Sequence, residues 1–323
     1  MATTSLPAFG DEPPIPATEP RPTQSDTGKD NFVAPDSREV RLSNLGGANT
    51  PIVMMFGPSN AGKTVALSRL AKYFKDTLGD VVVDRTFRTD EYYQKSLCKK
   101  YDEFLESIDP NRPINTPDAD FLAINFNERG QTKGPICKFI ELPGESLYKV
   151  DTPLANQPFP LYLRQIFNHP ARKIIVFTVP LPDPQTDAAG AMRDEQFDRF
   201  CARIRMVISF NPGLKRDSYI FAVTKADEQV SLVQGAVVAN RAAFRDALIS
   251  RPGFDNVVKA LKDARHRLVV VPFSAGQMVP TVNGQTALAV GDNAWPKMLW
   301  GEIRNAITGR GFWAELRRMF GLA

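Results

Sequence analysis

Histidine and cysteine are scarce in this chain of 323 residues, which has two of the first and three of the second. His169 and His266 lie far apart, and no histidines and cysteines have the spacing of zinc ligands, so we expect no zinc site. A sparse, odd set of cysteines is typical of free thiols in a reducing compartment. The three are Cys98, Cys137 and Cys201.

A long apolar run and a strong excess of one charge are also absent. No stretch approaches the roughly 20 residues that a membrane-spanning helix needs. The first residues carry neither the charged nor the apolar region of a signal peptide. The formal net charge of +4 does not indicate the concentrated basic face of a nucleic-acid-binding protein. We therefore expect a cytoplasmic protein that binds no nucleic acid.

The composition divides the chain into three regions. Residues 1–46 are rich in proline, threonine, serine and acidic residues, so they cannot bury enough apolar surface to offset the entropy of ordering. We expect a disordered leader there, which is either simply solvated or binds a partner. Residues 47–290 carry the periodic apolar patterns of one folded domain, and residues 291–323 are expected to form an amphipathic helical extension.

The extension ends in an apolar stripe. A helix is predicted over residues 295–308, Gly309 and Gly311 then interrupt the pattern, and apolar residues recur at helical spacing beyond them. Such a stripe either packs on the core as a final helix or docks on a partner protein or a membrane surface. It consists of Phe312, Leu316, Met319 and Phe320.

Strand and helix patterns alternate through the folded domain. Residues 173–179, 218–223 and 267–273 are near-continuous apolar runs, which are typical of strands buried on both faces of a parallel sheet. The runs 121–126 and 137–142 flank a polar turn and predict an antiparallel hairpin. Alternation of this kind predicts an α/β domain with helices on both faces of the sheet. Shorter strands are predicted over residues 51–56 and 81–83.

Helical spacing of apolar residues marks the segments between these strands. The predicted helices cover residues 63–78, 91–108, 194–209, 238–249 and 254–265. In the second of them the apolar face consists of Tyr93, Leu97, Tyr101, Leu105 and Ile108.

The most informative motif is the loop from Gly57 to Thr64, which reads G-P-S-N-A-G-K-T. It follows an apolar strand and opens an amphipathic helix, which is the context of a Walker A loop. Glycines let backbone N–H groups close around phosphate oxygens, Lys63 reaches the β- and γ-phosphates from the exposed start of the helix, and the Thr64 hydroxyl binds Mg²⁺. The residues expected to contact the nucleotide here are Gly57, Asn60, Ala61, Gly62, Lys63, Thr64 and Val65.

A second motif, Glu141-Leu-Pro-Gly144-Glu145, ends the 137–142 strand. It resembles the D-x-x-G motif of GTPases, in which the glycine N–H contacts the γ-phosphate and the acid holds a water bound to Mg²⁺. Glutamate here places the carboxylate one bond further out, and Mg²⁺ demands short, regular ligand distances. We therefore expect Glu141 to act on the metal through water or from a shifted backbone.

Two further motifs follow later strands. Thr224-Lys-Ala-Asp227 is similar to the N/T-K-x-D motif, in which a carboxylate accepts the two donors on one edge of guanine while the stem of Lys225 lies across the base. Adenine lacks that donor pair, so Asp227 favours GTP over ATP. Ser274 and Ala275 resemble the S-A-x loop whose backbone N–H contacts the guanine carbonyl.

The four motifs, in this order, resemble the Ras-like P-loop GTPases over about residues 50–280. The resemblance implies a three-layer α/β fold around a six-stranded mixed sheet, parallel except for the strand that begins at Phe121. It implies GTP or GDP as ligand, Mg²⁺ as cofactor and a protein effector. The residues to which it assigns catalytic roles are Lys63, Thr116, Gly144 and Glu145, with Thr64, Thr116 and Glu141 at the metal.

Some assignments within this resemblance have alternatives. Thr116 stands where a switch threonine is expected, and Thr86 and Thr89 compete for that role. Arg112 fits either an internal arginine finger or an ordinary surface arginine. The long spacings and the acidic leader also look like the bacterial double-GTPase group, which would imply a second GTPase as partner.

Three functions are compatible with these motifs. The first is a regulatory GTPase switch in which Mg²⁺-GTP orders the segments around Thr116 and Gly144. Its intrinsic hydrolysis should be slow, because an ionised Glu145 cannot donate a hydrogen bond where Ras-like enzymes often have glutamine. The second is a GTP-binding scaffold that does not hydrolyse GTP, and the third is a P-loop ATPase, against which Asp227 argues.

Overall fold

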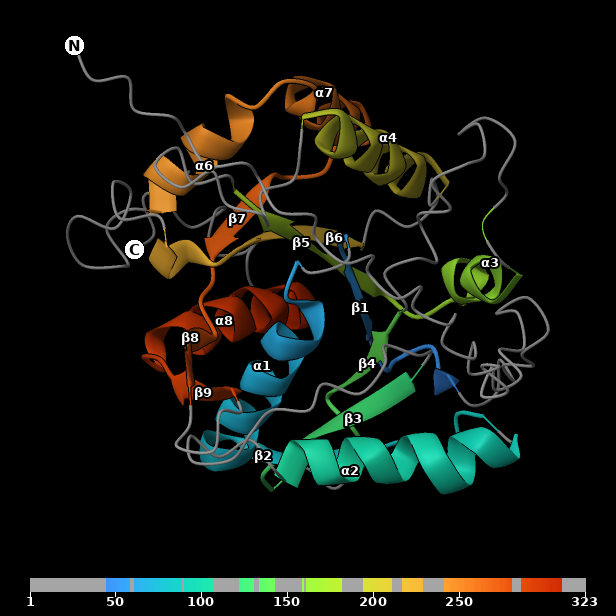
Figure 1. Cartoon of the computed structure of the whole chain (residues 1–323). Coiled ribbons are helices and arrows are strands. Elements are labelled where there is room, and N and C mark those ends of the chain that lie inside the picture. The colour runs from blue at the N-terminus through green and yellow to red at the C-terminus, as the bar shows by residue number, and fades with distance from the viewer. Residues whose placement is uncertain are drawn as a thin grey trace, which may run out of the picture. The chain divides into compact units, whose positions relative to one another are not determined.

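Figure 1 shows a computed structural model of the chain. It describes residues 45–58, 61–88, 90–106, 122–130, 134–142, 159, 161–181, 194–210, 217–228, 241–280 and 286–309. Almost all of the predicted leader and the apolar stripe after Gly309 lie outside these ranges. So do the predicted site residues Asn60, Thr116, Gly144 and Glu145, together with Thr89 and Arg112.

The central element is a seven-stranded sheet with the order β2-β3-β4-β1-β5-β6-β7. Strands β4, β1, β5, β6 and β7 run parallel to one another, and only β3 runs opposite to its two neighbours. The bounds are β1 Ile52–Phe56, β2 Gly79–Val83, β3 Leu122–Glu128, β4 Cys137–Glu141, β5 Lys173–Pro180, β6 Ser218–Thr224 and β7 Val269–Pro272. The predicted α/β class, the β3–β4 hairpin and the mostly parallel sheet are confirmed.

The sheet has one strand more than the six expected. The extra strand is β2, which the apolar run 81–83 predicted as a strand but not as a member of this sheet. It pairs antiparallel with β3 along its whole length, with Val81 opposite Phe126. As the edge strand it buries Val81 and Val83 and exposes Asp80 and Val82, so one face packs on the core and the other faces solvent.

Helices cover both faces of the sheet, as expected (Figure 1). Helices α1 and α8 pack together on one face, where α8 also contacts β5, β6 and β7, and α2 lies against α1. Helices α4, α6 and α7 lie on the other face. The bounds are α1 Lys63–Thr77, α2 Cys98–Glu106, α3 Leu161–Asn168, α4 Asp194–Phe210, α6 Arg241–Ile249, α7 Phe254–Asp263 and α8 Ala294–Thr308. A separate hairpin, β8 Gly276–Pro280 and β9 Thr286–Val290, precedes α8 and was not predicted.

Helix α8 packs on the domain even though its residues belong to the predicted extension. Its Trp300 ring meets Phe74 of α1 edge-on at 4.8 Å and stacks on Phe126 of β3 at 5.8 Å between ring centroids. Large buried aromatic rings in such arrangements contribute both apolar area and ring contacts. None of the described helices is long and apolar enough to cross a membrane.

The second predicted helix contains a wide turn. Residues Tyr93–Leu97 form a π-helix that continues directly into α2. The predicted apolar face repeats every four residues, which drifts about 40° per step around a helix of 3.6 residues per turn. A π turn closes over five residues instead of four, so it reduces this drift and keeps Tyr93, Leu97 and Tyr101 buried together.

A buried ion pair joins the β2 side of the sheet to β4. Lys138 Nζ lies 2.5 Å from Asp84 Oδ2, and the two side chains are 6% and 5% exposed. Burial by itself raises the pKa of the Asp84 carboxyl, but hydrogen bonds from Lys138 and Thr86 outweigh it and leave the pKa below its ordinary value. The folded state therefore favours the ionised pair.

Replacing Lys138 by methionine should lower the free energy of unfolding by about 3–5 kcal/mol at pH 7, because it leaves the Asp84 carboxylate buried without its counter-charge. Urea denaturation measures this. The matched control is Lys95→Met, since Lys95 and its partner Glu91 are 75% and 77% exposed and such pairs contribute about 0–1 kcal/mol.

The free energy of unfolding lost in Lys138→Met should also depend on pH. Because the pKa of Asp84 is lowered in the folded state, the pair stabilises fully above the ordinary aspartate pKa of about 3.9. Its contribution declines as the pH falls through the lowered value. Equal destabilisation by the two lysine variants at pH 7 would contradict a structural role for this pair.

Candidate functional site

The sequence motifs meet at one edge of the sheet. Strands β4, β1, β5, β6 and β7 are parallel, so their carboxyl ends lie along the same edge. The glycine-rich loop follows β1, Glu141 ends β4, and Thr224 and Ser274 lie at or just after the ends of β6 and β7. In open α/β sheets, ligands bind in the crevice at this edge.

The glycine-rich loop begins in close contact with β5. A Cβ atom on Gly57 would lie 1.9 Å from Thr178 Oγ1 and 2.8 Å from the Thr178 carbonyl oxygen, so no side chain fits. The Thr178 hydroxyl in turn donates to the Phe56 carbonyl at 3.1 Å. Glycine is therefore required at this position for packing on the neighbouring strand.

Helix α1 begins at the far end of the same loop. Gly62 has φ 76°, a left-handed backbone that suits glycine, and its carbonyl accepts the first helical hydrogen bond, from Ala66 N at 2.7 Å. The first N–H groups of a helix have no partner within the helix, and no acidic side chain lies in this first turn. Backbone donors and the helix dipole there favour an anion.

Lys63 is buried, which contradicts the expectation of an exposed helix start. Its side chain is 7% exposed, and its Nζ donates to the carbonyls of Gly57 and Pro58, at 3.0 Å each. Burial lowers the pKa of this ammonium group, and the charge of Glu141 opposes the shift. The lysine folds back over the loop because carbonyl oxygens there offer acceptors that satisfy a desolvated cation.

Glu141 and Thr64 are brought together, although 77 positions separate them in the chain. The Thr64 hydroxyl donates to Glu141 Oε1 at 2.6 Å, and Glu141 is 1% exposed. Burial raises the pKa of the Glu141 carboxyl, while hydrogen bonds from Thr64 and Tyr101 and the charge of Lys63 oppose the shift. The acid is therefore held against the hydroxyl that the sequence assigned to the metal.

Tyr101 is a site contact that the sequence did not identify. Its hydroxyl donates to Glu141 Oε2, whereas the apolar stripe of its helix marked it only as a core residue. The stripe predicted its burial, which is 1% exposure. No local pattern could identify its partner, because that partner lies 40 positions away on another strand.

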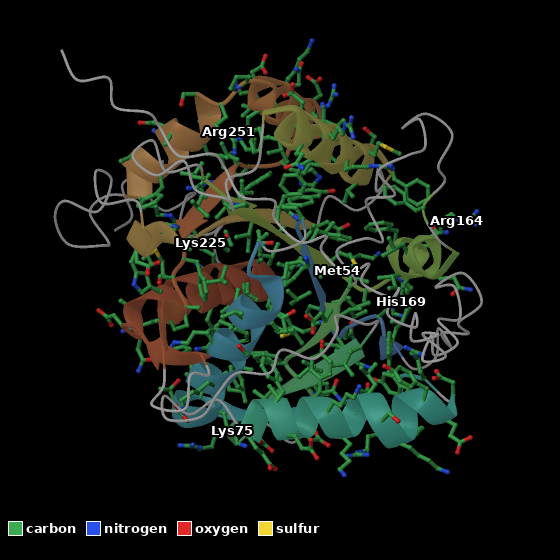
Figure 2. All side chains as sticks on the ribbon, in the orientation of Figure 1. Met54, Lys75, Arg164, His169, Lys225 and Arg251 are labelled. Carbon is green, nitrogen blue, oxygen red and sulfur yellow. The ribbon has the colours of Figure 1, made fainter. Side chains whose placement is uncertain are left out.

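The two loops assigned to the base are joined by backbone hydrogen bonds. Ala226 N donates to the Phe273 carbonyl at 3.1 Å, and Phe273 N donates to the Val223 carbonyl at 2.7 Å. The segment from Thr224 to Asp227 thus lies directly beside Ser274, and Figure 2 shows Lys225 at the end of β6.

Polar groups in these two loops fit a ligand with donors and acceptors. The Thr224 hydroxyl oxygen is buried and has no hydrogen-bond partner among the described residues. Asp227 is partly exposed and makes no hydrogen bond or ion pair within the described part of the chain. Ser274 is 2% exposed, and its Oγ accepts from Gly276 N at 3.1 Å, which shapes the loop. A carboxylate and an unpaired buried hydroxyl at one edge suit a polar planar ligand.

Arg69 connects helix α1 to the segment that follows β9. From the middle of α1, its Nη2 donates to the Gly291 carbonyl and to Asn293 Oδ1, both at 2.7 Å. Gly291 in turn approaches Gly276 so closely that a Cβ on it would lie 3.2 Å from the Gly276 Cα. The helix that carries Lys63 and Thr64 is therefore tied to the loop that follows Ser274, a link that the sequence did not predict.

The described residues contain no group of three histidine, cysteine, aspartate or glutamate side chains that could hold a metal by themselves. A metal beside Thr64 would need oxygen ligands from phosphate and water, which is how Mg²⁺ commonly binds. The donor set of one hydroxyl oriented by one carboxylate fits such a cation. Thr116, predicted at the metal, and Gly144 and Glu145, predicted to be catalytic, lie outside the described residues.

Comparison with known proteins gives only distant likenesses. No protein family model and no curated protein matches the sequence. One similar solved structure is nucleolar GTP-binding protein 1 of Plasmodium falciparum, with 11% identity, 86% of this chain and 96% of that chain covered, and a TM-score of 0.38.

Two other structures are similar at the same level. The signal recognition particle receptor SRb-GTP/SRX complex of Chaetomium thermophilum has 13% identity, with 72% of this chain and 93% of that chain covered and a TM-score of 0.35. A GTP-binding protein named engB has 13% identity, with 80% and 99% covered and a TM-score of 0.30. Because all three TM-scores are low, the function proposed below rests on the site alone.

Replacing Gly57 by alanine should destabilise the protein by about 1–3 kcal/mol, because the new methyl group overlaps Thr178 and forces the loop away from β5. Thermal or urea unfolding of the full chain measures the loss. Gly47→Ala is the control, since a Cβ there meets nothing within 4 Å. The double variant Gly57→Ala/Thr178→Ala should recover only part of the lost stability, because the backbone carbonyl at position 178 still obstructs the new methyl group. Full stability in Gly57→Ala would contradict this packing.

Proposed function

We propose that this protein binds GTP and GDP together with Mg²⁺ at the carboxyl edge of its sheet, as a Ras-like P-loop GTPase. The observation that carries the proposal is the joint placement of two half-sites. The Lys63–Thr64–Glu141 group lies at the ends of β1 and β4, and the hydrogen-bonded Thr224–Asp227 and Ser274 loops lie two and three strands from β1 along the same edge.

The phosphates fit the end of β1. Backbone N–H groups at the start of α1 and the Lys63 ammonium provide donors and positive charge for phosphate oxygens. Lys63 already contacts the Gly57 and Pro58 carbonyls, so its side chain reaches across the loop. Phosphate oxygens would replace those carbonyls as acceptors and carry more negative charge.

Magnesium fits beside the phosphates. Thr64 supplies one hydroxyl oxygen, and Glu141 accepts the proton of that hydroxyl, which leaves a lone pair of the oxygen for the cation. In this arrangement Glu141 acts on the metal through Thr64 or a water rather than as a direct ligand. The bound cation would neutralise charge on the β- and γ-phosphates.

Guanine fits the loops at the ends of β6 and β7. The Asp227 carboxylate can accept both protons from the N1 and N2 edge of guanine, and the unpaired Thr224 hydroxyl supplies a further polar contact. Adenine offers no such pair of donors, so we prefer GTP over ATP as ligand. A P-loop ATPase is the weaker alternative for this reason.

Hydrolysis of GTP is proposed to be slow. Glu145 is acidic where a water-positioning glutamine is usual in Ras-like enzymes, and Glu141 replaces the usual aspartate. The same two residues support a second candidate, a GTP-binding scaffold without useful turnover. We further propose a cytoplasmic regulatory role with a protein effector, which would be a second GTPase if the double-GTPase resemblance holds.

The direct test is the nucleotide content of the purified full-length chain, together with its rate of GTP turnover in Mg²⁺. We expect guanine nucleotide after extraction and a single-turnover rate well below that of efficient GTPases. Bound GTP with no measurable turnover would favour the scaffold, and adenine nucleotide would favour the ATPase. If the purified chain carries no nucleotide and binds none that is added, the proposal is refuted.

Replacing Lys63 by alanine should weaken GTP binding at least about 10-fold, because a hydrogen bond to a charged group contributes about 1.5–3 kcal/mol. Equilibrium binding of labelled GTP measures the change. Lys75→Ala is the control, since Lys75 lies exposed near the other end of α1 (Figure 2). Because Lys63 also donates to the loop carbonyls, circular dichroism must show that both variants are folded. An unchanged GTP affinity in folded Lys63→Ala would contradict the phosphate site.

Replacing Asp227 by asparagine should shift the preference from guanine to xanthine nucleotides. Xanthine has an oxygen where guanine has the N2 amino group, so the asparagine amide can donate to it and aspartate cannot. The mismatch with GTP should cost about 1–3 kcal/mol, measured by competition between GTP and XTP. Asp263→Asn, at an exposed residue that ends α7, is the control. An unchanged base preference would place the base elsewhere.

A further inference from the structure

Helix α2 contacts the proposed nucleotide site through the side chain of Tyr101. The Tyr101 hydroxyl donates to Glu141 Oε2, while Glu141 Oε1 accepts the Thr64 hydroxyl at 2.6 Å. The two oxygens of one buried carboxylate are therefore held by two different helices, α1 and α2. The direction in which Glu141 faces Thr64 depends on where α2 lies.

The position of Tyr101 follows from the wide turn that precedes it. The π turn Tyr93–Leu97 keeps the four-residue stripe on one helix face, so Tyr101 points inward one turn beyond Leu97. π turns occur frequently at functional sites. Helix α2 also packs on both α1 and β2, so it bridges the edge of the sheet and the helix of the glycine-rich loop.

Tyr93, on the same helix, shows what a purely structural tyrosine does here. It is fully buried, and its hydroxyl donates to the Asp84 carbonyl at 2.7 Å. A buried tyrosine hydroxyl needs a partner, and a backbone carbonyl is sufficient for that need. Tyr101 instead donates to an acid of the site, where packing alone does not require a charged partner.

We propose that Tyr101 is a positioning residue for Glu141, and that through it helix α2 controls how tightly the site holds Mg²⁺ beside the nucleotide. This inference rests on the proposed function. Thr64 provides the oxygen for the cation, Glu141 orients the Thr64 hydroxyl, and Tyr101 orients Glu141. A displacement of α2 that withdraws Tyr101 loosens Glu141, and the metal is then held less well.

The test compares Tyr101→Phe with Tyr93→Phe and the parent, all as full chains. Each variant removes one hydroxyl from a buried ring of the same helix. Release of radiolabelled GDP is followed by filter binding over a titration of MgCl₂, and GDP affinity is also measured in EDTA. Outer partners of a metal ligand typically change metal affinity by about 10- to 100-fold.

We expect Tyr101→Phe to raise the Mg²⁺ concentration for half-maximal GDP retention about 10-fold, the lower end of that range, and to leave the affinity in EDTA unchanged. Tyr93→Phe should lower the melting temperature without moving the Mg²⁺ titration. Tyr101→Phe that matches the parent overturns the inference, as does equal weakening with and without Mg²⁺, which marks a structural role. A parent that binds no GDP in either condition refutes the proposed function itself, and the inference with it.

Discussion

Parallel pairing of β1 with β4 on one side and with β5 on the other constrains the candidate site at the carboxyl edge of the sheet. Register matches Met55 with Glu141 across one interface and Phe56 with Phe177 across the other. These strands are buried on both faces, and a slip by one residue would exchange the side chains that pack on the two faces, so the pairings are strongly determined. They bring the start of the glycine-rich loop beside Glu141 and beside Thr178, whose side chain leaves room only for glycine at position 57.

The buried charges of Glu141 and Lys63 lie close to each other at the carboxyl edge of the sheet. Glu141 is almost completely buried, and an isolated carboxylate there would be very unfavourable. Hydroxyl groups from two helices and the nearby Lys63 ammonium offset that cost. Burial outweighs the attraction between Lys63 and Glu141, so it lowers the pKa of Lys63 and raises the pKa of Glu141. Both shifts favour the neutral form of the group. The edge is therefore a polar cluster whose parts depend on one another, and a change in either helix alters the whole cluster.

Much of the architecture and part of the site could be predicted from local patterns. Apolar runs identified the central strands, and the glycine-rich loop identified the start of α1, because periodicity and turn residues act over a few positions. The contacts of Tyr101 and Arg69 could not be predicted in this way. Each joins segments far apart in the chain, 222 positions for Arg69 and Gly291, and only the folded topology decides which segments meet.

The prediction of an exposed Lys63 was wrong for a related reason. A helix start after a loop is usually exposed, but the loop from Gly57 to Pro58 curves back and offers its carbonyls to the ammonium group. The run 81–83 was predicted as a strand, but its membership of the sheet was not, because its pairing with β3 is set by the rest of the domain. The β8–β9 hairpin was missed because short runs carry little periodicity.

Lys225 adds a trade-off between stability and function. Among the described residues other than glycine, only Lys225 and Arg265 have positive φ, at 56° and 58°, a backbone that costs roughly 1–2 kcal/mol for an L-residue. At Arg265 the end of α7 explains it, since Arg265 N and His266 N bond to Lys262 and Leu261 carbonyls. Lys225 directly follows strand β6, and glycine would relieve the strain there. Selection for stability alone would favour glycine there, so a more heat-resistant form of this protein could be obtained at the expense of the lysine stem proposed to lie on the base.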